Sequence, residues 1–150
     1  MGCELLITNY ESLRMKLRLA LALIFLAAIT RLLPHPHNFA PITAMGLFGA
    51  TYFSRRWMSV MVPFAALFLS DLFLNNVIYS QYFEGFTLIT SWWIYAAFAL
   101  VIALGWITLR GSAFSPAKTA GIALASSLIF FLITNFAHWA TFNMYPKSFQ

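Results

Sequence analysis

The sequence predicts an all-α membrane protein, a polytopic bundle of transmembrane helices with five spans in this chain. Hydrophobic residues make up 61% of the 150 residues and charged residues only 9%, against about 25% in an ordinary soluble domain. The few charges also fall between long neutral stretches, so they do not line one water-facing side of each helix. These two observations exclude a soluble domain, a coiled coil and a disordered tail.

The net charge and the cysteine usage exclude further classes of protein. A net charge of +5 on such an apolar chain indicates membrane flanks rather than a basic face, so we expect no nucleic-acid partner. The single cysteine, Cys3, excludes an intramolecular disulfide and a multi-cysteine metal site. The chain has no nucleophile-elbow serine motif, no HExxH motif and no phosphate-binding glycine loop. We therefore expect neither an enzyme nor a bound metal or cofactor.

The first two predicted spans cover residues 17–33 and 39–53. Both are short, because a hydrocarbon core of about 30 Å takes about 20 apolar residues in a helix. The segment between them, residues 34–38, contains Pro34 and Pro36. Each proline lacks a backbone donor and disfavours helix at the residue before it, so we expect a sharp and rigid connection.

The remaining predicted spans cover residues 57–76, 86–109 and 117–140. The last two lie inside wholly uncharged stretches that are long enough for a full crossing. Five spans that start inside must end outside. We therefore expect a sixth helix in the full-length family and a truncation of this chain at its C-terminus.

Lysine and arginine set the expected orientation, because cytoplasmic loops are enriched in them. We predict a bacterial inner-membrane protein with residues 1–18 as a cytoplasmic N-terminal segment and residues 19–150 as one transmembrane domain. Met15 precedes two cations and an apolar run, a pattern typical of a translation start, so residues 1–14 are open to being a misassigned start. The orientation leaves Arg31 and Lys147 outside and places seven cations inside: Arg14, Lys16, Arg18, Arg55, Arg56, Arg110 and Lys118.

Polar side chains near the outer ends of the spans form the candidate site. An ionisable group at mid-membrane depth costs at least about 2.5–3.5 kcal/mol, so such groups usually face the bundle interior and pair with one another. Arg31 and Asp71 are the natural pair. They predict either the polar floor of an outward-opening cavity or a structural ion pair between the first and third spans; an arginine that extends to the lipid headgroups is a further alternative.

Other side chains complete the predicted ligand set. Asn135 and His138 lie three residues apart on one helical face, although a hydrogen bond between helices alone would account for Asn135. Trp92 or Trp93 would stack on a ring of the ligand. His35 and Asn38 would shape the mouth of the cavity. The predicted ligand-binding residues are Arg31, His35, Asn38, Asp71, Trp92, Trp93, Asn135 and His138.

Small residues recur at a spacing of four, which lets helices approach closely. Such ridges serve either packing within the chain or docking onto a partner membrane protein. They are Ala40 with Ala44, Gly46 with Ala50, and Ala117 with Gly121 and Ala125.

Several blocks of the chain carry a resemblance to a known family: residues 31–36, 38–39, 41–42, 47–49, 52–53, 70–74, 130–136 and 144–147. On these blocks the chain resembles an uncharacterised bacterial membrane family, a domain of unknown function described as a transport protein. That family is similar at fold level to the substrate-binding subunits of energy-coupling-factor transporters. Those subunits are six-helix bundles that capture a small molecule from outside and dock on a transmembrane coupling protein driven by ATPases.

The resemblance implies a membrane transport protein that binds a small solute in an outward-facing polar cavity. Its partners would be the lipid bilayer, the solute and a transmembrane coupling protein with ATPases. Two alternatives stay open at this point. A membrane-embedded enzyme acting on lipid would need Asp71 and His138 close enough to share a proton, and a non-catalytic membrane assembly protein would show engaged small-residue ridges and no cavity.

Overall fold

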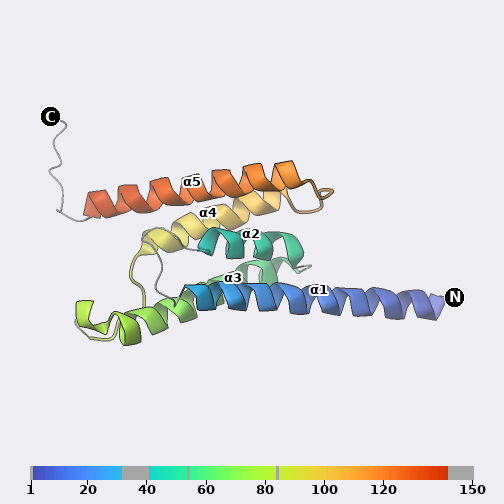
Figure 1. Ribbon diagram of the computed structural model, residues 1–150, viewed down its shortest axis with the longest axis horizontal. Coiled ribbons are helices and arrows are strands. Elements are labelled where there is room, and N and C mark those ends of the chain that lie inside the picture. Colours follow the sequence, from blue (N-terminus) through green and yellow to red (C-terminus); the bar gives the residue numbers. More distant parts are fainter. Residues whose placement is uncertain (1, 32–40, 54, 84, 142–150) are drawn as a thin grey trace.

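The computed structural model describes residues 2–31, 41–53, 55–83 and 85–141. The regular structure of these residues is entirely helical, and Figure 1 shows consecutive α-helices running in opposite directions. The elements are α1 (Gly2–Thr30), α2 (Ile42–Tyr52), α3 (Arg56–Phe73), a π-helical turn η1 (Leu74–Ile78), a 3-10 turn η2 (Ser80–Tyr82), α4 (Trp92–Thr108) and α5 (Pro116–Thr141).

The prediction of an all-helical chain is confirmed for the described residues, but five membrane spans are not established. By length and composition, two helices are candidate spans, Arg56–Ile78 and Pro116–Thr141. Helix α2 has 11 residues, which rise about 17 Å and so reach about half of a hydrocarbon core. Helix α4, with 17 residues, is also shorter than the predicted span over 86–109. The apolar stretches of the sequence therefore predicted longer spans than the helices α2 and α4 of the structure.

Helix α1 begins at Gly2 rather than near residue 17, so the predicted N-terminal segment continues into the first predicted span. Residues 3–30 contain neither proline nor glycine, and nothing in them interrupts a helix. The N-terminal half of α1 extends beyond the other helices in Figure 1. Its contacts with the bundle are made by its C-terminal half, where Ala20 and Ile24 are buried.

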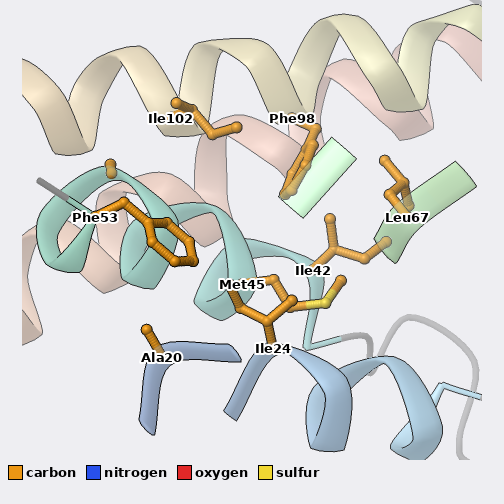
Figure 2. Close-up of a cluster of buried hydrophobic side chains, with 9 residues drawn as sticks. Ala20, Ile24, Ile42, Met45, Phe53, Leu67, Phe98 and Ile102 are labelled. Atoms are coloured by element: carbon orange, nitrogen blue, oxygen red, sulfur yellow. The ribbon is translucent and has the colours of Figure 1, made fainter. Parts of the chain in front are cut away.

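The short helix α2 lies at the centre of the bundle and contacts α1, α3, α4 and α5. Figure 2 shows side chains from α1, α2, α3 and α4 converging on it. Glycine allows α4 to lie close to α2, because a Cβ added at Gly105 of α4 would lie 2.8 Å from the Ala50 Cβ of α2. Gly46 and Ala50 pack within the chain: a Cβ added at Gly46 would lie 3.0 Å from the Phe98 ring, and Ala50 is 0% exposed. The apolar core consists of Ala20, Ile24, Ile42, Met45, Ala50, Phe53, Leu67, Phe98 and Ile102.

The alternating direction of the helices gives the bundle two chemically different ends. We name one the Arg31 end, since Arg31 follows α1 there and Asp71 lies near the C-terminus of α3. The opposite end, at which α2 and α4 end and α3 and α5 begin, we name the basic end. Its cations are Arg55, Arg56, Arg110 and Lys118.

Candidate functional site

The candidate site is built around Arg31 and Asp71, which are 40 residues apart in the sequence. Arg31 Nη2 donates to Asp71 Oδ1 at 2.5 Å, and the two side chains are 10% and 4% exposed. The predicted pairing of these residues is confirmed. Because the guanidinium is held inside the bundle, the alternative of an arginine extended to the lipid headgroups is wrong.

Two further side chains complete what we call the Arg31 cluster, which consists of Arg31, Ser70, Asp71 and Tyr95. Arg31 Nη1 donates to Ser70 Oγ at 2.5 Å, and Ser70 Oγ donates to the carbonyl of Leu67 at 2.8 Å. The Tyr95 hydroxyl donates to Asp71 Oδ2 at 2.8 Å. Each carboxylate oxygen therefore accepts a hydrogen bond, and the cluster joins α1, α3 and α4 with no net charge.

Sequence reasoning did not place Ser70 or Tyr95 in the site. Tyr95 is part of an apolar run that begins with two tryptophans, so the sequence around it does not indicate a polar role for its hydroxyl. A usable signal was present nevertheless, because a buried tyrosine hydroxyl usually finds a hydrogen-bond partner.

Beyond Asp71, α3 changes into the π-helical turn Leu74–Ile78, a feature that often accompanies functional sites. Asn75, four residues after Asp71, is 4% exposed. Its Oδ1 accepts from Thr90 Oγ1 at 2.8 Å, whereas its Nδ2 has no hydrogen-bond partner among the described residues. A buried amide donor thus lies about one helical turn from the Arg31 cluster.

The neighbouring Asn76 holds the connection between η2 and α4 in place through hydrogen bonds. Its Nδ2 donates to the carbonyls of Leu72 at 2.8 Å and Thr87 at 2.9 Å, and its Oδ1 accepts from the Thr87 N–H at 2.9 Å. The Asn76 side chain thus forms hydrogen bonds with both the backbone N–H and the backbone carbonyl of Thr87. Asn76 therefore positions a segment that also carries Thr90, the partner of Asn75.

Replacing Asn76 with alanine is expected to loosen this segment without unfolding the bundle. The N–H and the carbonyl of Thr87 lose their partners, and because both bonds are only partly buried, each loss costs about 0.5–1.5 kcal/mol. Hydrogen exchange at the Thr87 amide should accelerate, while exchange in α2 stays unchanged. Ser80→Ala is the matched control, since its exposed hydroxyl makes only a local bond to Val77; equal acceleration in both variants would contradict the role of Asn76.

The structure does not bring the other predicted residues to the Arg31 cluster. Trp92 and Trp93 are 74% and 53% exposed at the start of α4. Asn135 and His138 are exposed on α5, and the Asn135 amide donates to its own helix at Phe131. His35 and Asn38 lie outside the described residues.

The position of α5 explains why Asn135 and His138 do not join the site. Within the described ranges, α5 contacts α2 and α4 but neither α1 nor α3. The face of α5 that packs inward carries Ser126 and Ala137, which are 0% and 4% exposed. The face bearing Asn135 and His138 points outward, so the proximity of Asp71 and His138 that a lipid-acting enzyme would need is not formed.

Two cavities lie elsewhere in the bundle. One of about 410 Å³ lies at the basic end, and one of about 230 Å³ lies between α1 and α2. Arg31, Asp71 and Tyr95 line neither of them, so the predicted outward-facing cavity at the Arg31 cluster stays a prediction. In the described part of the chain, no three His, Cys, Asp or Glu side chains gather as a metal site would require.

Comparison with known proteins gives one family. A family model described as "Family of unknown function (DUF6580)" matches residues 11–150. No curated protein and no solved structure matches the chain. The matched range includes every residue of the Arg31 cluster, and the description supports the predicted resemblance to an uncharacterised family without naming an activity.

Proposed function

The chain belongs to the DUF6580 family of unknown function, and from its geometry we propose an integral membrane protein that binds a small polar solute beside the Arg31 cluster. It acts as a transport protein, or as the capture subunit of one, in a bacterial inner membrane. Its N-terminus and basic end face the cytoplasm, and the Arg31 end faces outward. Arg31, Asp71 and Asn75 are the residues we assign to the solute.

The outer surface of the bundle supports residence in a bilayer. Only 11% of the most apolar stretch of α5 is buried inside the protein. On that helix Leu124 and Phe136 are 73% and 66% exposed, which in water would form part of a large unfavourable apolar patch. Lipid removes that cost. The cations of the basic end support the orientation, since lysine and arginine mark the cytoplasmic side.

A single observation carries the solute-binding proposal: a buried ion pair lies next to a buried amide donor for which the described residues offer no hydrogen-bond partner. Charges within a membrane bundle are costly and commonly mark substrate paths. An ion pair that only holds helices together would not require a buried amide donor such as Asn75 Nδ2, for which the described residues provide no acceptor. That donor calls for an acceptor, so the proposed solute carries a carbonyl, carboxylate or hydroxyl oxygen.

The remaining parts of the proposal come from the family resemblance. A capture subunit would dock on a transmembrane coupling protein with ATPases. His35 and Asn38 keep their proposed place at the mouth, because they follow Arg31 within seven residues of sequence. Trp92, Trp93, Asn135 and His138 are not part of the proposed site.

The test separates solute binding from folding by using the double variant Arg31→Met with Asp71→Leu. Replacing a buried ion pair with apolar residues of similar volume is often neutral or stabilising, so this variant should still fold. Mass spectrometry would identify small molecules retained by the gently purified full chain. We expect the double variant to retain at least about tenfold less solute than the wild type, which corresponds to about 1.4 kcal/mol of binding.

Asn135→Ala provides the matched control, since it removes an exposed polar side chain whose amide donates to the Phe131 carbonyl of its own helix. This variant should retain solute as the wild type does. Equal retention by the wild type and the double variant, or a wild type that retains no small molecule, would contradict the proposal.

A further inference from the structure

The cavity of about 410 Å³ at the basic end is separate from the Arg31 cluster. It lies between α2, the connection from α4 to α5, and the first turns of α5. Gly111 in that connection has a φ of 72°, which lies in the left-handed region that favours glycine. The connection ends at Pro116, the first residue of α5. The volume of the cavity falls within the usual range of small-molecule sites, about 300–1,000 Å³.

The cavity is amphipathic. Leu47 and Phe48 of α2 and Ala123 of α5 contribute apolar lining. Polar groups gather where the chain enters α5: Lys118 Nζ donates to Ser112 Oγ at 3.0 Å, in an exposed position. An ammonium group has three donors, so this bond leaves two of them for a ligand.

The charges near the cavity indicate what kind of ligand it would bind. The basic end carries four cations, and Lys118 is the one among them that lines the cavity. Among the described residues from 41 to 141, the only acidic side chain is Asp71, which is paired at the opposite end of the bundle. A ligand that matches this cavity therefore has an apolar body and an anionic head.

We propose that this cavity binds an anionic phospholipid, with its acyl chain between α2 and α5 and its phosphate on Lys118. Basic pockets between helices on the cytoplasmic side of a membrane are suited to anionic headgroups. The proposal shares the membrane orientation of the proposed function but uses a different site. Loss of solute binding at Arg31 and Asp71 would leave it unaffected.

The test measures lipid binding to the full chain by native mass spectrometry from micelles containing phosphatidylglycerol, phosphatidylcholine or palmitate. The wild type should retain phosphatidylglycerol in preference to phosphatidylcholine. Lys118→Gln should reduce that retention at least about tenfold, a change of about 1.4 kcal/mol, and Lys118→Arg should preserve it. Ala123→Trp, which fills the cavity without changing the charge, should also reduce it.

Arg56→Gln is the matched control, because Arg56 is an exposed cation of the same end that does not line the cavity. It should retain phosphatidylglycerol as the wild type does. An equal loss in Arg56→Gln and Lys118→Gln would indicate general attraction to a basic surface and overturn the site. Equal retention of phosphatidylcholine, or retention of palmitate without phosphatidylglycerol, would overturn the choice of an anionic phospholipid.

Discussion

Replacing Asp71 with alanine is expected to lower the free energy of unfolding by about 3–5 kcal/mol, because it leaves a buried charge without its partner. The Arg31 side chain is only 10% exposed, so water does not readily replace the lost carboxylate. The Tyr95 hydroxyl loses its acceptor at the same time. Unfolding of the detergent-solubilised chain by titration with SDS would measure the loss.

The double variant Arg31→Met with Asp71→Leu is the control for this expectation. It removes both charges together, so the penalty of an isolated charge disappears, and its stability should approach that of the wild type except for the Tyr95 hydrogen bond, which both variants lose. Comparison of the two variants separates the cost of an unpaired arginine from the value of the pair. A single variant as stable as the double variant would contradict the burial of Arg31 in the bundle.

Replacing Gly49 with alanine is expected to destabilise the bundle by about 3 kcal/mol, at the upper end of the usual cost of overpacking. A Cβ at this position would lie 2.3 Å from Pro63 Cγ and 3.0 Å from the backbone carbonyl oxygen of Ser59. Neither a proline ring nor a helix backbone moves aside as a flexible side chain does. Helices α2 and α3 would have to separate, and the same SDS titration would measure the effect.

Gly121→Ala is the matched control on α5. A Cβ there meets nothing within 4 Å, so the substitution should be neutral or stabilise the helix by up to about 1 kcal/mol through its higher helix propensity. Similar losses in the two variants would show that the effect of Gly49→Ala does not come from the contact between α2 and α3.

The Arg31–Asp71 pair shows how far sequence reasoning reached into the site. Each residue is the sole formal charge in its apolar neighbourhood, and the cost of an unpaired charge made the other its natural partner. Tyr95 was missed, and Asn75 was left out of the predicted ligand set, for a different reason. A hydroxyl in an apolar run and one amide among several asparagines acquire meaning only when the packing of α3 and α4 shows what they contact.

Asn135 and His138 show where the same reasoning failed. Their spacing correctly put them on one face of α5, but spacing does not determine which face turns inward. That choice depends on which helices α5 packs against, and those are α2 and α4.

The sequence by itself predicted a helical chain of apolar segments, the long apolar helix α5, and the pairing of Arg31 with Asp71. These follow from local terms: helix propensity, segment length and the cost of a lone charge. Only the tertiary structure decided that the 11-residue α2 is central, that Tyr95 and not His138 meets Asp71, and that a cavity opens beside Lys118. Those outcomes depend on the rotation and contact of helices distant in sequence, which arise from side-chain packing across the whole bundle.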